Sequence, residues 1–452
     1  MLSALVCLGR HTITGLLCAS GRQFRDWSGD YRVFSESRFD PGEIFGVLRR
    51  GVVDSLKGGE PLITAMDDSI LRKTGRKIPG VKYLRDPLGP PFHVNFVRAQ
   101  RVIQLSGALL PRAGQGPARM VPLDFVHAPS PRKPRKDAPP EAWKAYRRTQ
   151  REQSVSRVGV RRVTALRGQL DADASGRPRP LWVIVDGRFT NKPVLKDLPE
   201  RTTLIGRIRS DAKLYHLPSP RDRAGRGRRR VYGDRDPTPE ALRQDEGIPW
   251  QTVNVFAARK RHDLKVKTLS PLRWRSAGGR HTLRVIVIAP LAYRPRRGAR
   301  LLYRKPAYLI CTDPDLPLER VIQAYIWRWD IEVNFRDEKQ ILGVGEPQVR
   351  APASVRTAPA LLVAAYGMLL LAAARTFGPN GKPTHLPQPK WRSKKAKLRA
   401  STSDLIQHLR AELWGQALAV SNFSRFMDKP IPHMNPEKNI PDLRSAVLYA
   451  AG

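Results

Sequence analysis

Four polar residues recur at helical spacing between Tyr325 and Lys339, in the stretch YIWRWDIEVNFRDEK. They are Tyr325, Arg328, Glu332 and Lys339. At about 100° of rotation per residue, they fall within a stripe about 60° wide on one face of a helix. The apolar residues among them, including Trp329, provide enough surface to bury much of this helix. Charges in a mostly buried helix are costly unless they pair with each other, a metal or a ligand, so we expect a site that handles an anion.

Two apolar runs elsewhere in the chain end in an aspartate. Residues 61–69 read PLITAMDDS and residues 181–187 read LWVIVDG, which predicts two buried strands that carry carboxylates at their C-terminal ends. One such aspartate is often only a cap or an ion-pair partner. Asp67 and Asp186 together with Glu332 on a buried helix are a less common set. Asp68 competes with Asp67, and we favour Asp67 because it directly ends the predicted strand.

Three carboxylates suit phosphoryl transfer that depends on metal ions. Hard cations such as Mg²⁺ prefer oxygen ligands and leave positions open for phosphate. Two ions about 3.5–4 Å apart can clamp the attacking and leaving oxygens of an in-line displacement. Such chemistry needs no nucleophilic side chain, since water or a DNA 3′-OH attacks the phosphorus.

The spacing Tyr-x2-Arg-x3-Glu-x6-Lys resembles the YREK signature of bacterial insertion-sequence DDE transposases of the cut-and-paste type. RWDIEVNF resembles the Arg-Trp-x-Ile-Glu core of that signature, MDDS resembles the first-aspartate motif of the family, and VIVDGRF resembles its second-aspartate strand. The resemblance covers residues 60–375, approximately. It also favours Asp67 over Asp68, because Ser69 then takes the position of the Ser or Thr that follows the family's first aspartate.

The resemblance implies an α/β fold, with a ribonuclease-H-like mixed-sheet core and a β-rich insertion between the second aspartate and the glutamate. It implies that Asp67, Asp186 and Glu332 are the catalytic and metal-binding residues, with Mg²⁺ as the cofactor and Mn²⁺ able to substitute. By the same resemblance, Arg328 and Lys339 hold phosphates near the cleaved DNA end, and Tyr325 contacts the same backbone; a guanidinium fork and an ammonium group suit that role.

Tyr308 begins the strand that leaves the insertion. Family members that pass through a DNA hairpin stack a flipped base on an aromatic residue in this strand. A Tyr in place of the family's Trp can still stack on a base. A core aromatic explains the residue equally well, and both alternatives stay open.

The implied activity is that of a transposase, which binds terminal inverted repeats, cuts DNA at the ends of the element and joins the 3′-OH to target DNA. Its partner is double-stranded DNA, and a homodimer holds the two ends in a synaptic complex. The alternatives are a ribonuclease-H-like nuclease without strand transfer and an inert DNA-binding regulator. The transposase predicts that the three carboxylates converge within metal-bridging distance, whereas the regulator predicts that they diverge.

Five regions are predicted around these residues. They are a helical N-terminal DNA-binding region (1–57), the first part of the core (58–209), the β-rich insertion (210–305), the second part of the core with the YREK helix (306–377), and a basic linker with a C-terminal helical region (378–452). A plain helical cap on the core is the alternative for residues 1–57. Further expected elements are strands at 92–97, 101–110, 203–208 and 307–312, the last returning to the main sheet, one long basic helix at 140–170, a buried helix at 358–377 and a capped helix at 403–418.

The charge of the chain points to a polyanion. Its 452 residues include 81 Lys and Arg against 40 Asp and Glu, a formal net charge of +41. Neutralising phosphates releases counterions, so nucleic-acid binding is the first explanation, and the Arg bias of a GC-rich genome is the second. The basic runs 221–230 and 390–399 are candidate contacts to the DNA backbone.

The remaining composition indicates where the protein acts. Three cysteines without a CxxC or a His cluster argue against a disulfide framework and a zinc site, and favour a reducing compartment. We expect neither a signal peptide nor a membrane span. The composition therefore favours a soluble intracellular protein, and the resemblance to bacterial transposases implies a cytoplasmic one associated with the nucleoid.

Overall fold

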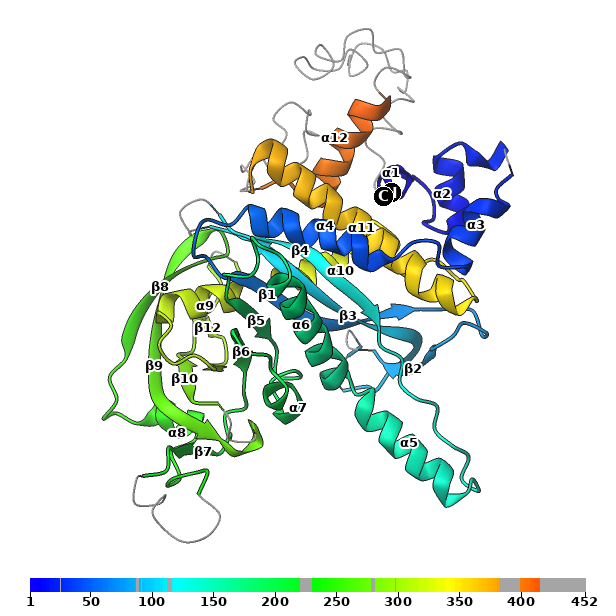
Figure 1. The fold of residues 1–452 in the computed structure, drawn as a ribbon. Helices are drawn as coiled ribbons and strands as arrows, with labels where there is room; N and C mark the ends of the chain where they lie inside the picture. Colours follow the sequence, from blue (N-terminus) through cyan, green and yellow to red (C-terminus); the bar gives the residue numbers. More distant parts are fainter. Residues whose placement is uncertain are drawn as a thin grey trace.

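A mixed sheet runs through the molecule and carries helices on both faces (Figure 1). The structure is a computed structural model, and it describes residues 1–414 except 25, 87–88, 91, 112–115, 220–229, 278–280, 297, 380 and 382–398. Within the described residues the sheet contains 11 strands. Strand pairing places the predicted catalytic aspartates at the centre of this sheet.

The central strands have the order β4–β3–β1–β5–β6. β3 is antiparallel to β1 and β4, whereas β5 is parallel to both β1 and β6. Three antiparallel strands followed by two parallel ones make the ribonuclease-H-like arrangement, so the expected fold class is confirmed. The strands are β1 (Leu62–Arg72), β3 (Phe96–Leu109), β4 (Arg119–His127), β5 (Leu181–Val185) and β6 (Thr202–Arg207), with β2 (Lys82–Arg85) on the outer edge of β3.

The strands of the insertion continue this sheet. β13 (Ala307–Cys311) pairs antiparallel with β6, so the prediction that it returns to the main sheet is confirmed. β10 and β9 follow, with β7 and β8 beyond them. The insertion also contains a short helix. Its elements are β7 (Leu214–His216), α8 (Pro239–Gln244), β8 (Gln251–Ala257), β9 (Lys260–Trp274), β10 (Leu283–Ile288), and the small hairpin of β11 (Ala292–Tyr293) and β12 (Leu302–Tyr303).

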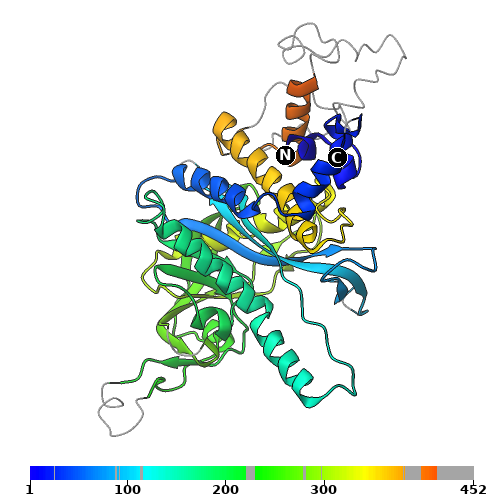
Figure 2. The same cartoon turned by 45° about the vertical axis from the view of Figure 1, so that its right-hand side comes forward.

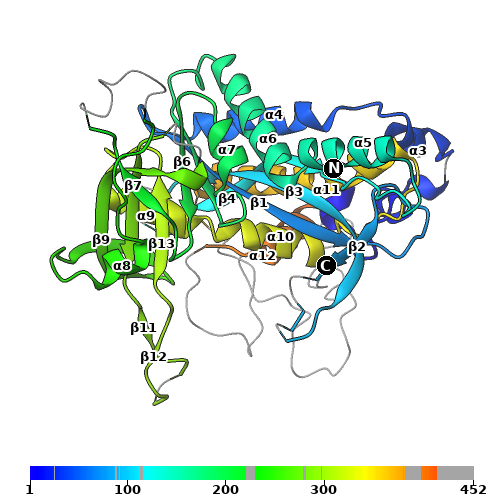
Figure 3. The ribbon, with the colours of Figure 1, turned by 90° about the horizontal axis from the view of Figure 1, so that it is seen from below.

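Helices bury the two faces of the sheet in separate cores. One core packs α9 and the start of α10 against β5, β6 and the insertion strands. The other packs α4, α6 and α11 against the opposite face. The helices of these layers are α4 (Pro41–Asp54), α6 (Val155–Asp171), α9 (Leu318–Trp327), α10 (Asp330–Gln340) and α11 (Pro352–Phe377). Figure 3 shows α10 and α4 on opposite sides of the central strands.

The helices near both ends of the described chain pack on α11. α4 is part of the core, with Leu48, Val52 and Val53 fully buried. This packing favours a helical cap for residues 1–57, and DNA binding by that region stays a prediction. α11 is long and apolar enough to cross a membrane, but most of it is buried inside the protein. The helices on it are α1 (Leu2–Val6), α2 (Ile13–Ala19), α3 (Ser28–Ser35) and α12 (Thr402–Trp414).

Two predicted elements differ from the structure. The strands expected at 92–97 and 101–110 are one strand, β3, and the helix expected at 140–170 is two, α5 (Pro140–Glu152) and α6. The second helix begins anew because Ser154, with φ −60° and ψ 145°, leaves the helical region. Most of the basic runs 221–230 and 390–399 lies outside the described residues, as does the end of the helix expected at 403–418.

The contact between α4 and α11 depends on Gly367. A Cβ at this position would lie 2.7 Å from Leu48 Cδ1. We expect Gly367→Leu to overpack the interface and lower the free energy of unfolding by about 1–3 kcal/mol in urea denaturation. Gly168→Ala is the matched control, because Gly168 is an exposed helical position with no atom within 4 Å of a Cβ. This control should raise stability by about 0.5–1 kcal/mol. Equal changes in the free energy of unfolding for the two variants would contradict the close packing of Leu48 on Gly367.

Candidate active site

Asp67 and Asp186 lie side by side on neighbouring parallel strands. Met66 pairs with Val185, and each aspartate is the next residue of its strand. β5 ends there, whereas β1 continues to Arg72 while still paired with β3. Asp67 therefore lies within a strand, whereas we predicted that it ends one. The early end of β5 exposes that edge of β1 and makes room for a site.

The two aspartates share the sheet face that carries α9 and α10. Side chains alternate along a strand, so Asp67 follows Ile63 and Ala65, and Asp186 follows Trp182 and Ile184. All four of those apolar residues belong to the core beneath α9. Two hydrogen bonds between side chains and backbone stabilise the turn after Asp186. Asp186 Oδ1 accepts from Arg188 N at 2.8 Å, and Thr190 Oγ1 donates to Asp186 O at 2.7 Å.

Asp68 points to the opposite face. Its carboxylate pairs with Arg101 Nη1 at 2.5 Å and with Arg188 Nη1 at 3.1 Å. Burial raises the pKa of Asp68, and Arg188 and Arg101 oppose that rise. These contacts account for Asp68 as an ion-pair residue. The shared face favours Asp67 as the first aspartate of the site.

Arg328 lies between Asp67 and Glu332. Its Nη1 donates to Asp67 Oδ2 at 3.0 Å and its Nη2 donates to Glu332 Oε1 at 2.8 Å. Among the described residues no group of three or more His, Cys, Asp or Glu side chains is placed to hold a metal ion. The expected convergence of three carboxylates is thus absent from this structure, because the guanidinium of Arg328 bridges two of them.

The predicted YREK helix is two helices joined by a tight turn at Arg328 and Trp329. The turn contains bonds of 3₁₀ type: Trp329 N donates to Ile326 O at 3.2 Å, and Glu332 N donates to Trp329 O at 3.0 Å. At this corner Trp329 is 64% exposed, although we expected it to help bury the helix. The turn leaves Arg328 and Glu332 in contact on the side that faces β1.

The site holds more negative charge than its surroundings neutralise. Burial and the neighbouring Asp186 together raise the pKa of Asp67 to about 7, against the effect of Arg328. Burial disfavours the charge of Arg328, but Asp67, Tyr325 and Glu332 raise its pKa overall. Two crowded carboxylates with one arginine between them and Glu332 are a donor set that fits a hard cation, which would relieve the same repulsion.

Lys339 and Tyr325 extend this line of residues along β1. Lys339 Nζ donates to Ser69 Oγ at 2.5 Å, two residues beyond Asp67, and burial lowers the pKa of Lys339. Tyr325 is half-buried beside Arg328, and burial raises the pKa of its hydroxyl. Arg328 and Lys339 thus contact β1 directly, at Asp67 and Ser69, whereas Glu332 and Tyr325 lie beside Arg328.

Tyr308 does not join this group in the structure. It is only 6% exposed and belongs to the core on the opposite face. Its hydroxyl donates to Glu240, and burial together with this bond raises the pKa of Tyr308 to about 12. These contacts are those of a core aromatic. Base stacking by Tyr308 stays a prediction, and it requires the ring to leave this packing.

Several residues that hold α10 in place were not singled out from the sequence. Met120, on the outer edge of β4, donates its N–H to Asp330 Oδ2 at 2.8 Å, and its carbonyl accepts from Asn334 Nδ2 at 3.0 Å. Arg399 pairs with Asp330, and Thr402 Oγ1 donates to Asp337 Oδ2 at 2.6 Å. Asp330, Asn334 and Asp337 could have been found from the sequence, because polar residues in a buried helix need partners. Arg399 ends the basic run 390–399, which was predicted to contact the DNA backbone, and its pairing with Asp330 was not predicted.

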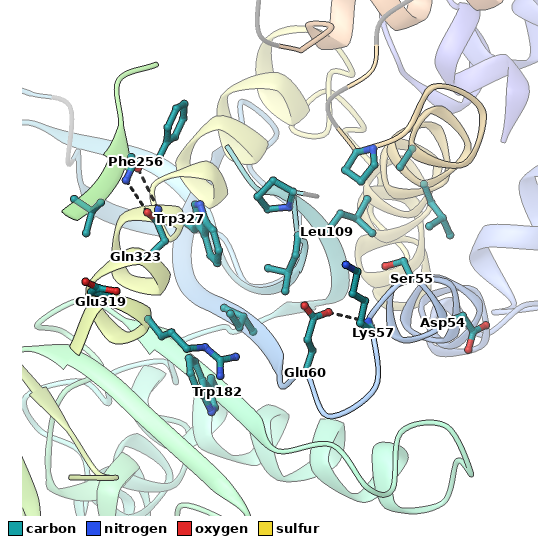
Figure 4. Close-up of a pocket in the computed structure, with 18 of the residues that line it drawn as sticks. Asp54, Ser55, Lys57, Glu60, Leu109, Trp182, Phe256, Glu319, Gln323 and Trp327 are labelled. Atoms are coloured by element: carbon teal, nitrogen blue, oxygen red, sulfur yellow. Dashed lines mark hydrogen bonds between the residues drawn. The ribbon is translucent and has the colours of Figure 1, made fainter. Parts of the chain in front are cut away.

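A cavity of about 840 Å³ lies at the other end of the same strands (Figure 4). Ile63 and Trp182, near the starts of β1 and β5, line it together with Gln323 and Trp327 of α9. Gln323 exchanges two hydrogen bonds with the backbone of Phe256. None of the predicted site residues lines this cavity. Sites in such folds lie at the carboxyl ends of parallel strands, where Asp67 and Asp186 are.

Comparison with known proteins gives one family. The sequence model of the family described as DDE superfamily endonuclease matches residues 1–280, more than half of the chain. The match includes Asp67 and Asp186 and ends before α9, so it does not reach Glu332. No curated protein matches the sequence.

Glu338, on α10, makes the stability of this region depend on pH. Its carboxylate is buried and accepts from Gln104 Nε2 at 2.8 Å. Burial raises the pKa of Glu338 to about 8. Between its ordinary pKa of 4.5 and 8 the folded state keeps a proton that the unfolded state has lost, so stability falls as pH rises, by at most about 1.4 kcal/mol per pH unit.

We expect Glu338→Gln to reduce this dependence on pH, because an amide does not titrate. Its oxygen can still accept the hydrogen bond from Gln104. Urea denaturation at pH 5, 6, 7 and 8 measures it. The control is Glu246→Gln, on the exposed stretch after α8, which should retain the wild-type dependence. Parallel curves for wild type and Glu338→Gln would contradict a buried, protonated Glu338.

Proposed function

The chain belongs to the family of DDE superfamily endonucleases, and from this premise we propose that it is a transposase of a bacterial insertion sequence of the cut-and-paste type. Its substrate as an endonuclease is DNA. In the proposed reaction it binds terminal inverted repeats, cleaves at the ends of the element and transfers the 3′-OH to target DNA. The observation that carries the proposal is the contact of Arg328 with both Asp67 and Glu332, beside Asp186 on one sheet face.

Asp67, Asp186 and Glu332 are the residues that would hold Mg²⁺, or Mn²⁺ in its place. The bound ions would supply a polarised nucleophile and stabilise charge on the leaving oxygen. The crowding of Asp67 and Asp186 supports this role, because a pair of repelling carboxylates gains from a cation between them. Release of Glu332 by Arg328 would complete the set of three carboxylates.

Arg328, Lys339 and Tyr325 are the proposed contacts to DNA phosphate. A guanidinium that binds two carboxylates in the free protein has the fork geometry to bind a phosphate instead. Lys339 donates to the hydroxyl of Ser69 and lies over the ring of Phe335, and neither contact uses all three of its N–H donors, so the ammonium group could also bind a phosphate oxygen. Arg328 and Lys339 contact β1 two residues apart, at Asp67 and Ser69, so they could bind successive phosphates of a DNA strand.

A cut-and-paste reaction also needs the two ends of the element held together, for which we propose a homodimer in the synaptic complex. The net charge of +41 supports binding of two long polyanions, the terminal repeats and the target. We propose action in the cytoplasm at the bacterial nucleoid. A nuclease without strand transfer would cleave ends but leave target DNA unjoined, and an inert regulator would bind without cleaving.

Substitutions of the acidic residues test the proposed metal ligands. We expect Asp67→Asn, Asp186→Asn and Glu332→Gln each to lower cleavage and joining of end-containing DNA by roughly 100-fold or more with Mg²⁺ or Mn²⁺. Asp68→Asn is the matched control. It should lose stability, because Arg101 and Arg188 lose a buried partner, yet retain cleavage. Full activity of Glu332→Gln, or loss of activity in Asp68→Asn alone, would overturn the assignment. Chelation of divalent metal should stop cleavage and leave DNA binding intact.

Substitutions of the basic residues separate chemistry from affinity. We expect Arg328→Ala and Lys339→Ala to slow cleavage by roughly 100-fold, as for lost groups that stabilise charge at a reacting phosphate. Their effect on affinity for end-containing DNA should not exceed that of Arg336→Ala. Arg336 is the matched control, because it removes one exposed charge from the same helix, where it pairs with Asp337. Loss of binding without a specific loss of cleavage would place Arg328 and Lys339 away from the cleaved end.

A further inference from the structure

α5 stands away from the rest of the molecule. Figures 1 and 2 show it extending beyond the body from the start of α6. None of its residues, Pro140 to Glu152, is buried. Its helix contacts are with α6. The helix therefore adds almost nothing to either core.

One face of α5 is a stripe of four basic residues, which we call the α5 stripe. They are Lys144, Arg147, Arg148 and Arg151, at offsets of 0, 3, 4 and 7, which neighbour each other on one side of a helix. In the described part of the chain none of the four forms an ion pair with an acidic side chain. The same side chains line a hollow of about 790 Å³, together with Arg157 of α6 and two acidic residues of α5, Glu141 and Glu152.

This arrangement has a cost in stability. Like charges three and four residues apart on a helix repel each other, and a helix of this length is marginal in water without packing. α5 also carries Glu141 and Glu152, one at each end, so the excess of positive charge lies in the turns between them. Repulsion within the α5 stripe is relieved if a polyanion lies along it.

The stripe is connected to the turn that carries Asp186. Asn191, at the end of this turn, donates through Nδ2 to Ser156 Oγ at 2.7 Å, one turn into α6 from the end of α5. Arg161 Nη1 donates to Glu152 O at 2.9 Å and ties the C-terminus of α5 to α6. Arg188, of the same turn, pairs with Asp68 beside Asp67. α5 therefore projects from the catalytic edge of the sheet at a fixed origin.

We propose that α5 is a DNA-binding arm, whose α5 stripe contacts the phosphate backbone of the duplex next to the cleaved end without reading its sequence. The proposal rests on the proposed function for the choice of DNA as the polyanion. Arginine and lysine contacts to phosphate fix register and orientation, and they carry no sequence information themselves. An arm that starts at the Asp186 turn would hold the duplex in line with Asp67 and Asp186.

The test is the salt dependence of DNA binding, measured with end-containing duplex in EDTA so that no cleavage occurs. The variant Lys144→Gln/Arg147→Gln/Arg148→Gln/Arg151→Gln should lose at least tenfold in affinity at low salt. Its slope of log affinity against log salt should be smaller by about 2–4 units, since each phosphate contact contributes about 0.9. The variant Arg147→Lys/Arg148→Lys/Arg151→Lys is the matched control. It preserves charge and should keep the wild-type slope.

Two results of this experiment would overturn the proposal. An unchanged slope in the Gln variant excludes contact with DNA, and an equal loss in the Lys variant excludes a purely electrostatic contact. A loss of binding to anionic lipid vesicles, with DNA binding unchanged, would assign α5 to a membrane surface. Circular dichroism and thermal unfolding of both variants should match wild type apart from α5, because no buried residue is changed. If the wild-type protein binds DNA through α5 but does not cleave it, the proposed function is wrong and the inference on α5 is still supported.

Discussion

The structure depends on a balance of charge at one strand edge. Asp67 and Asp186 are forced together by the register of two parallel strands, and burial makes that proximity unfavourable. Arg328 compensates by bridging Asp67 to Glu332. The bridge opposes the rise in the pKa of Asp67 that burial and Asp186 cause, and it places a guanidinium between Asp67 and Glu332. If these residues hold a cation, as proposed, the cation would take over from Arg328 as the counter-charge of Asp67.

That balance requires α10 to stay at a fixed position beside β1. The helix achieves this by binding the outer edge of β4, where Asp330 and Asn334 satisfy both backbone groups of Met120. An open sheet edge is otherwise a row of unpaired polar groups. Arg399 and Thr402 then hold α10 from its other side. Residues far apart in sequence therefore set the place of Glu332, and the C-terminal part of the described chain supports the site without contributing a ligand.

Sequence patterns located the strands of β1 and β5, because both are apolar runs whose faces are buried, and they located the polar face of Tyr325 to Lys339 by its period. They missed β4, since Pro122 and Asp124 interrupt its alternation and Pro is tolerated there only at a bulge on an edge. They also missed the turn at Arg328 and Trp329, because every residue in it is compatible with a helix. The partners of Asp330 lie in β4 and near α12, and such long-range contacts leave no local pattern. The spacing of four residues indicated a site; the pairing of strands decided which of Asp67 and Asp68 faces it.

Like charges are held close together both in the site, at Asp67 and Asp186, and on the surface, in the α5 stripe. Inside, repelling carboxylates at Asp67 and Asp186 are unfavourable until a cation joins them. Outside, the repelling cations of the α5 stripe are unfavourable until a polyanion joins them. If a cation binds the first group and DNA binds the second, as proposed, binding would relieve both repulsions and would favour the complex over the protein alone. The hydrogen bond from Asn191 to Ser156 connects the turn after Asp186 to the start of α6, next to α5, so that DNA bound by the α5 stripe would lie near the two aspartates.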